Sequence, residues 1–227
     1  PIKAPYLVST PDFVACHVPS YLSKYDVLAG IKQNGTLLLN SLWDEKETLE
    51  RIPDHVKSVI GKKNISLYII NATKIAAEIG LGGRTNTILQ SAFFKITNII
   101  PYEDAVTYMK QAILKSYGKK GEKVVNMNYA AVDRGGEYIK VEIPADWKDI
   151  TAKFENPNKD RLAPSFVKEI ADEVNAQCGD RLPVSKFMDI ADGTMPAGSA
   201  AYEKRGVAVK VPQWDAQKCI QCNTCAF

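Results

Sequence analysis

Three cysteines near the end of the sequence have the residue type and spacing of an iron–sulfur site. Cys219, Cys222 and Cys225 follow the pattern C-x2-C-x2-C. Bacterial cluster sites extend this pattern to C-x2-C-x2-C-x3-C-P, which would place the fourth cysteine beyond the last residue, Phe227. Half of a zinc site and free thiols are the alternatives, but zinc sites usually pair two C-x2-C units at longer separation. The spacing favours a 4Fe–4S cluster whose ligand set is incomplete in this sequence.

A glycine-rich stretch is a second place where chemistry could occur. Residues 80–86 have the sequence Gly-Leu-Gly-Gly-Arg-Thr-Asn. The dinucleotide fingerprint G-x-G-x-x-G would need a third glycine where Thr85 stands, and it would have to follow a strand rather than an expected helix. A glycine-rich turn between two helices is therefore the favoured interpretation. Arg84 and the backbone amides that open the next helix at Thr85 and Asn86 could still hold an anion.

The other polar residues form no catalytic constellation. His17 and His55 are the only histidines. We expect His17 in the core because it stands in an apolar run, and His55 in solvent because its neighbours are polar. Neither the G-x-S-x-G nucleophile motif nor the H-E-x-x-H metal motif occurs. We therefore assign no catalytic residue in this sequence.

The composition limits the class of protein. At 227 residues, 45% hydrophobic and 24% charged, the chain suits one large globular domain with small attachments. The formal net charge of +3 is too small to favour a nucleic acid or an anionic membrane as partner. No apolar run approaches the roughly 20 residues of a membrane helix. Five cysteines without disulfide-type spacing favour a reducing, cytoplasmic setting.

Apolar runs and helical periodicities alternate over residues 6–143. The runs expected as buried strands are 13–18, 36–40, 65–70 and 138–143. The expected helices are 21–31, 44–52, 54–60, 72–79, 85–97, 102–117 and 122–132. Continuous apolar strands are typical of a sheet covered by helices on both faces. The sequence predicts an α/β fold with a layered, mostly parallel sheet covered by helices.

The composition changes after Ile143. Residues 151–164 have the composition of a linker, and residues 166–178 are an expected helix. Residues 179–212 are rich in proline and glycine, and such a segment is too thin to form its own core, so we expect it to wrap a neighbour. The expected organisation is an α/β domain at 1–150, a linker with a helical extension at 151–191, a short segment at 192–213 and the cysteine segment at 214–227. Because the first residue is Pro1 and the cysteine motif is cut, we expect a piece of a larger protein.

Several motifs in combination resemble one family. They are DFVACH at 12–17, YDVL at 25–28, LNSLW at 39–43, KIAAEIG at 74–80, GRTN at 83–86, QSAFFK at 90–95 and AYEKRG at 201–206. Together they resemble pyruvate:ferredoxin (flavodoxin) oxidoreductase over essentially the whole chain. The α/β part resembles its gamma-type domain, residues 201–206 its short EKR segment, and the cysteine motif the start of its two-cluster ferredoxin domain.

The resemblance implies a large homodimeric enzyme that uses thiamine diphosphate and Mg2+. Such an enzyme converts pyruvate and coenzyme A to acetyl-CoA and carbon dioxide, and passes electrons through 4Fe–4S clusters to ferredoxin or flavodoxin. The thiamine-binding domains would be other domains of the same chain outside this sequence, so we expect the isolated piece to be inactive. Cys219, Cys222 and Cys225 would be the first cluster ligands. An electron-transfer or scaffold subunit with a ferredoxin module and no 2-oxoacid chemistry is the alternative.

The resemblance also associates the gamma-type domain with the access of coenzyme A. Coenzyme A carries phosphates, which helix-opening amides and basic side chains bind. Local chemistry suggests two groups of candidates: Ser41 and Lys46, near the start of the helix that Ser41 or Asp44 would cap, and Arg84, Thr85 and Asn86 at the glycine-rich turn.

Overall fold

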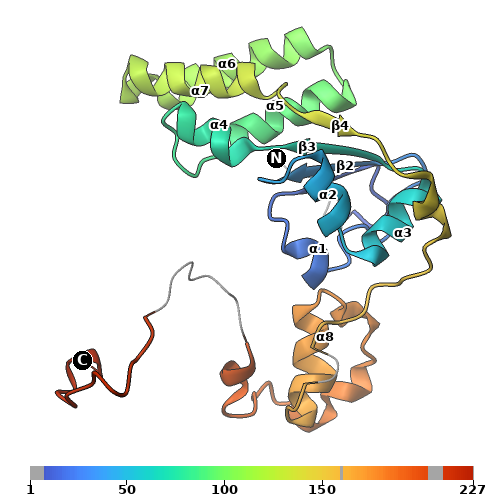
Figure 1. Ribbon diagram of the computed structural model, residues 1–227, viewed down its shortest axis with the longest axis vertical. Coiled ribbons are helices and arrows are strands. Elements are labelled where there is room, and N and C mark those ends of the chain that lie inside the picture. The colour runs from blue at the N-terminus through green and yellow to red at the C-terminus, as the bar shows by residue number, and fades with distance from the viewer. Residues whose placement is uncertain (1–7, 159–160, 204–211, 227) are drawn as a thin grey trace.

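The computed structural model describes residues 8–158, 161–203 and 212–226 (Figure 1). Its centre is a four-stranded sheet in the order β1-β2-β3-β4. The strands are β1 (Phe13–Cys16), β2 (Thr36–Asn40), β3 (Ser66–Ile70) and β4 (Ile139–Val141). The first three are parallel, and β4 runs antiparallel to β3 at the edge. The predicted α/β fold with a mostly parallel sheet is confirmed.

The central strand β2 is buried on both faces, which explains its continuous apolar run. Leu37, Leu38 and Leu39 of β2 are each at most 1% exposed. Because successive side chains of a strand point to opposite faces, Leu37 and Leu39 pack in one core cluster and Leu38 in another. The register pairs Leu37 with Leu67 and Leu38 with Tyr68, so β3 continues both clusters.

Helices cover the two faces in separate groups (Figure 1). Three helices pack in the core cluster on one face: α1 (Tyr21–Lys24), α2 (Glu45–Arg51) and α3 (Asp54–Lys63). Three others pack in the cluster on the opposite face: α4 (Ala72–Glu78), α5 (Asn86–Thr97) and α7 (Glu122–Arg134). A third cluster joins α6 (Tyr102–Tyr117) to α7, and the three-residue turn η1 (Gly118–Lys120) connects these two helices. The predicted bounds of 36–40 and 102–117 agree with β2 and α6.

The segment predicted as one helix at 21–31 forms only a single helical turn. After α1, Tyr25 has extended backbone with φ −133° and ψ 152°. Gly30 has φ +71°, and a Cβ built there would lie 2.0 Å from the carbonyl oxygen of Ser9. Leu28 and Ile31 are nevertheless buried. The apolar spacing that suggested a helix instead belongs to a turn that folds over the core.

The helix predicted to end at Gly61 continues to Lys63, and Asn64 ends it with a left-handed φ of 51°. Gly61 has a packing role, because α3 lies against the short turn η2 (Ala145–Asp149) at this point. A Cβ on Gly61 would stand 2.4 Å from the backbone nitrogen of Lys148. Only glycine allows the two backbones to approach so closely.

Gly61→Ala is expected to lower the free energy of unfolding by about 1–3 kcal/mol, because the backbone of η2 must shift to admit the methyl group. Urea unfolding followed by circular dichroism measures the change. Gly83→Ala is the matched control, since a Cβ there meets no atom within 4 Å; it should change stability by no more than about 0.5 kcal/mol. Equal stability of the two variants would contradict the assigned role of Gly61.

The extension after the α/β domain is organised by a short helical segment. The helix predicted at 166–178 is a π turn, η3 (Val167–Ala171), followed by α8 (Asp172–Asn175). Short 3-10 turns follow: η4 (Gly179–Arg181), η5 (Val184–Ile190), η6 (Ser199–Tyr202) and, in the cysteine segment, η7 (Thr224–Ala226). The predicted helix is cut short where Gln177 takes a left-handed φ of 62°. Residues 204–211, which include part of the EKR segment, lie outside the described residues.

An arginine–aspartate pair holds this extension together. The Asp172 side chain is only 3% exposed, and Arg161 binds both of its carboxylate oxygens, the Nε contact being 3.0 Å. Arg161 also donates from Nη1 to the carbonyl oxygen of Tyr202 at 2.6 Å. One guanidinium therefore ties α8 to the end of η6. Within the described ranges, no helix is both long and apolar enough to cross a membrane.

Candidate functional site

The carboxyl ends of β1, β2 and β3 meet at one edge of the sheet, where open α/β sheets usually bind ligands. Asn40 joins the three ends. Its Nδ2 donates to the carbonyl oxygen of His17 at 3.1 Å, and its Oδ1 accepts from the backbone N–H of Ala72 at 3.0 Å. The buried Asn40 was not predicted as a site residue. A polar residue directly after a buried apolar run was the signal that could have indicated it.

Ser41 and Lys46 lie beside this edge, on the connection from β2 to α2. Ser41 is 5% exposed, and its Oγ accepts from the backbone N–H of Trp43 at 3.0 Å. Of the two caps expected for this helix, Asp44 is the one that caps α2, because its side chain accepts from the backbone N–H of Glu47 at 2.8 Å. Lys46 is exposed. The first turn of α2 thus already holds carboxylates, which oppose the binding of a phosphate.

The glycine-rich turn has a different electrostatic character. Gly80 and Gly82 have positive φ values of 85° and 61°, and a Cβ on Gly82 or Gly83 would meet no atom within 4 Å. The turn is closed by the backbone N–H of Leu81, which donates to the carbonyl oxygen of Ala76 at 2.8 Å. Thr85 precedes α5, a helix of 12 residues with no acidic side chain in its first turn. The Thr85 side chain does not cap the N-terminal amides of α5, and no carboxylate in the first turn of α5 balances their positive field.

Arg84 supplies a cation at this turn. Its side chain is exposed, and no hydrogen bond or ion pair to it occurs among the described residues. Arg84, Thr85 and Asn86 are brought together at the start of α5. No described interaction joins them to Ser41 or Lys46, so the two groups of candidates stand on separate elements.

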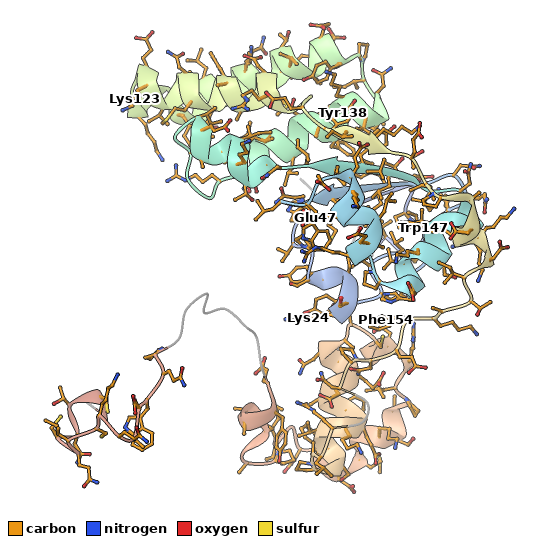
Figure 2. All side chains as sticks on the ribbon, viewed as in Figure 1. Lys24, Glu47, Lys123, Tyr138, Trp147 and Phe154 are labelled. Atoms are coloured by element: carbon orange, nitrogen blue, oxygen red, sulfur yellow. The ribbon has the colours of Figure 1, made fainter. Side chains whose placement is uncertain are left out.

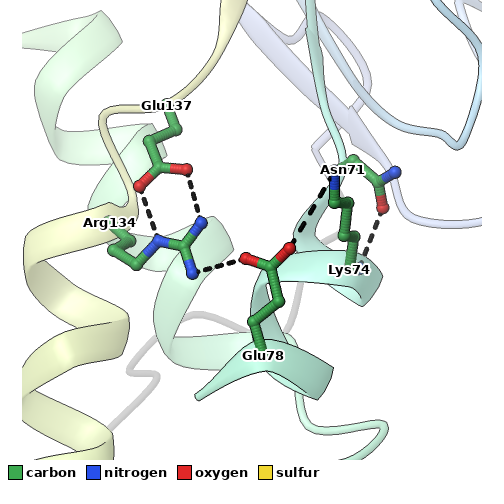
Figure 3. Close-up of polar contacts among 5 residues, drawn as sticks. All are labelled: Asn71, Lys74, Glu78, Arg134 and Glu137. Carbon is green, nitrogen blue, oxygen red and sulfur yellow. Dashed lines mark hydrogen bonds and ion pairs between the residues drawn. The ribbon is translucent and has the colours of Figure 1, made fainter.

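A network of ionic contacts fixes α4, the helix that enters the glycine-rich turn (Figure 3). Arg134 of α7 binds Glu137 at 2.6 Å and Glu78 of α4 at 2.8 Å. Lys74 reaches Glu78 at 3.9 Å, and its backbone N–H is capped by Asn71 at 2.9 Å. The hydrogen bonds with Arg134 lower the pKa of Glu137, and those with Glu137 and Glu78 raise the pKa of Arg134. The network joins the last turn of α4 to the end of α7.

Glu137 gives this network a predictable pH dependence. Its pKa is lower in the folded protein than its ordinary value of 4.5, so the stabilisation is present above that value and is lost as the pH falls through the folded pKa. Glu137→Gln is expected to remove this part of the acid sensitivity. Urea unfolding of both proteins, near neutral pH and in the acid range, measures it. An unchanged difference between the two pH values in Glu137→Gln would contradict the assignment.

The two histidines have environments opposite to those predicted. His17 is exposed because β1 stops at Cys16, before the apolar run ends. His55 is partly buried, and its ring contacts that of Phe154 with the centroids 5.3 Å apart. Its Nε2 is buried without a hydrogen-bond partner among the described residues. This burial lowers the pKa of His55.

The three cysteines of the tail are accessible thiols. Cys219 is partly exposed, and Cys222 and Cys225 are exposed. The backbone N–H of Gln221 donates to the sulfur of Cys219 at 3.4 Å and lowers the pKa of that thiol. The Thr224 hydroxyl lies 3.2 Å from the sulfur of Cys222 and has the same effect on its pKa. Hydrogen bonds of this kind favour the thiolate, which is the form that binds iron.

The donor set suits part of a cluster site. Left-handed backbone at Gln221 and Asn223, with φ of 57° and 58°, turns the chain between successive cysteines. Three thiolates at this spacing fit three corners of a 4Fe–4S cluster, and a fourth ligand is needed from elsewhere. In the part of the chain that the structure describes, no three His, Cys, Asp or Glu side chains are close enough to hold a metal ion. The structure thus does not bring the sulfur atoms of the three cysteines together around one metal position.

Comparison with known proteins gives strong similarities. The family model "Pyruvate ferredoxin/flavodoxin oxidoreductase" matches residues 1–138, and a second model, "EKR", a domain of unknown function, matches residues 152–208. The chain is 50% identical over 228 aligned residues to a pyruvate-flavodoxin oxidoreductase of Enterobacter agglomerans, and 47% identical to a pyruvate:ferredoxin oxidoreductase of Moorella thermoacetica. Both alignments cover 100% of this chain and 19% of the relative.

Two further similarities are to a differently named enzyme and to a solved structure. A pyruvate dehydrogenase [NADP(+)] of Cryptosporidium parvum is 42% identical over the whole chain, which spans 13% of that protein. The crystal structure of the pyruvate oxidoreductase subunit PORC of Thermotoga maritima matches 60% of this chain and 67% of its own, with a TM-score of 0.47 and 24% identity. From the family model and the identities over its full length, the chain belongs to the pyruvate ferredoxin/flavodoxin oxidoreductase family.

Proposed function

We propose that this chain is a segment of an enzyme that converts pyruvate and coenzyme A to acetyl-CoA and carbon dioxide. The electron pair released from pyruvate passes to flavodoxin or ferredoxin. One observation carries the proposal: two oxidoreductases named for pyruvate and for these carriers are 50% and 47% identical to the chain over all of it. Because the chain spans only 19% of these relatives, the rest of the enzyme supplies the reaction centre.

The cofactors divide between this chain and the remainder of the enzyme. Thiamine diphosphate with Mg2+ would be bound by other domains, in a homodimer, and would supply the chemistry that cleaves the 2-oxoacid. Cys219, Cys222 and Cys225 would hold part of a 4Fe–4S cluster, which accepts and donates single electrons. Residues 1–150 would then be the gamma-type domain, 151–191 the linker with its helical extension, 192–213 the EKR segment, and 214–227 the start of the ferredoxin domain. The cysteine usage suits a cytoplasmic enzyme.

The contact of this chain with coenzyme A is proposed at the glycine-rich turn. Arg84, Thr85 and Asn86 lie together at the N-terminus of α5, and the Arg84 guanidinium has no partner among the described residues. Ser41 and Lys46 remain candidates from the sequence, but the α2 terminus beside them is capped by Asp44 and followed by Glu45 and Glu47. A phosphate is attracted by the first arrangement and repelled by the second.

Arg84→Ala in the full-length enzyme is expected to raise the KM for coenzyme A by about tenfold, the equivalent of one charge-assisted hydrogen bond of roughly 1.5 kcal/mol. Initial rates at varied coenzyme A concentration measure it. Lys46→Ala is the matched control and is expected to leave this KM within about twofold, as a surface charge beside compensating carboxylates should. An unchanged KM in Arg84→Ala would remove the turn as a coenzyme A contact.

The alternative is an electron-transfer or scaffold subunit without 2-oxoacid chemistry. Full-length protein incubated with pyruvate, coenzyme A and an oxidised carrier distinguishes the two. Formation of acetyl-CoA supports the enzyme, and carrier binding without pyruvate consumption supports the scaffold. The isolated chain should form no acetyl-CoA, because it spans so little of its relatives.

A further inference from the structure

Four lysines gather at one end of the pair formed by α6 and α7. Lys115 lies near the end of α6, Lys119 and Lys120 lie in the turn η1, and Lys123 lies at the start of α7. All four are exposed. Figure 2 labels Lys123 at the outer end of α7. We call these four residues the lysine tip.

The lysine tip concentrates the charge of the whole chain. Residues 115–123 contain the four lysines and one carboxylate, Glu122, so their net charge of +3 equals that of all 227 residues. The remainder of the chain is therefore balanced. Within the described ranges no carboxylate forms an ion pair with the tip, whereas Lys110, on the same helix, pairs with Asp133 at 2.6 Å.

Helix electrostatics explain only part of this cluster. Cations are favoured at the C-terminus of α6, which suits Lys115 and the two lysines of η1. Lys123 is in the first turn of α7, where the helix dipole disfavours a cation and adds its own positive field. The Lys120 ammonium lies 5.3 Å from the centre of the Tyr117 ring, a contact that keeps it near the helix end without neutralising it. The stability of the two helices therefore explains the positions of Lys115, Lys119 and Lys120, but not that of Lys123.

We propose that the lysine tip is a docking surface for an acidic protein face, that of the electron carrier. The inference rests on the proposed function, because the relatives are named for flavodoxin and ferredoxin. A compact tip on an otherwise balanced chain suits a partner with clustered carboxylates, whereas a nucleic acid would need a more extended basic stripe. Exposed lysines act mainly by steering association, so their effect is on the rate of encounter and fades with added salt.

The test uses the full-length enzyme with Lys119, Lys120 and Lys123 all changed to glutamate. The control changes Lys148, Lys153 and Lys168 to glutamate, three exposed lysines outside the tip, so that total charge changes equally. At low salt the tip variant should show a kcat/KM for the carrier at least tenfold below wild type, and a flatter decline as salt is added. The control variant should keep the wild-type value within about threefold. Wild-type carrier kinetics and salt dependence in the tip variant, or an equal loss in the control, would overturn the proposal.

Two additional readouts separate this proposal from the proposed function. Pyruvate oxidation with a small neutral redox dye needs no protein docking, so the tip variant should retain it. Failure of every protein, wild type included, to oxidise pyruvate with the dye would refute the proposed function alone. Binding of oxidised flavodoxin or ferredoxin, measured by calorimetry, tests the tip without turnover: weaker binding by the tip variant supports docking, and equal binding overturns it.

Discussion

In the full-length protein, Cys222→Ala is expected to lose one 4Fe–4S cluster and to reduce carrier reduction by more than about a hundredfold. Alanine offers no donor atom in place of the Cys222 thiolate. Loss of an outer-shell partner of a metal site typically costs roughly 10–100-fold, and loss of a ligand itself should exceed that. Iron content, the EPR spectrum of the reduced protein and the rate of carrier reduction are the measurements.

Thr224→Val is the matched control for this cysteine. Its hydroxyl lies 3.2 Å from the sulfur of Cys222, so valine removes one hydrogen bond and keeps all three thiols. The control should retain its iron and lose at most about tenfold in rate, although the potential of the cluster should shift. A Cys222→Ala protein with the full iron content and an unchanged EPR spectrum would exclude Cys222 as a ligand.

Arg161→Ala is expected to destabilise the extension by about 3–5 kcal/mol, because it leaves the carboxylate of Asp172 buried without its partner. The Asp172 side chain is 3% exposed, and water cannot readily replace the guanidinium. The same change removes the donor to the carbonyl oxygen of Tyr202, so η6 should separate from α8. Hydrogen exchange of residues 161–203 and urea unfolding measure these effects.

Arg181→Ala is the control for this variant, since Arg181 is an exposed arginine in the same extension. It should change the unfolding free energy by no more than about 0.5 kcal/mol. Exchange should stay at the wild-type rate in β2 and β3 of both variants, because the described hydrogen bonds of Arg161 go to Asp172 and Tyr202 and to neither strand. An Arg161→Ala protein with wild-type exchange around α8 would contradict the account of the extension.

The α/β domain could be predicted well because its strands and long helices bury whole faces. The apolar run at 36–40 matches β2, and the periodic face of 102–117 matches α6. The prediction of a helix at 21–31 was wrong because buried residues three to four apart also occur in a turn that folds over a core. The backbone of Gly30 packs against the carbonyl oxygen of Ser9, leaving no space for a Cβ. This contact between separate segments depends on the tertiary fold, so the spacing of apolar residues along the chain could not predict it.

The polar residues were harder to place than the apolar ones. Arg161 and Asp172 belong to no motif, and only the folded extension brings the guanidinium onto the buried carboxylate. Their pairing could not be predicted from spacing. The sequence offered both helix openings, at Asp44 and at Thr85, as candidate phosphate contacts, since each has a basic residue nearby. They differ in the acidic side chains of the first turn, which α2 has and α5 lacks.

The most direct test of the proposed function is to measure acetyl-CoA and reduced carrier together in one reaction of the full-length protein. Pyruvate, coenzyme A and oxidised flavodoxin or ferredoxin are supplied, and both products are followed with time. The account predicts one electron pair delivered to the carrier for each acetyl-CoA formed. Carrier binding without acetyl-CoA, or acetyl-CoA formed without matching reduction of the carrier, would contradict it.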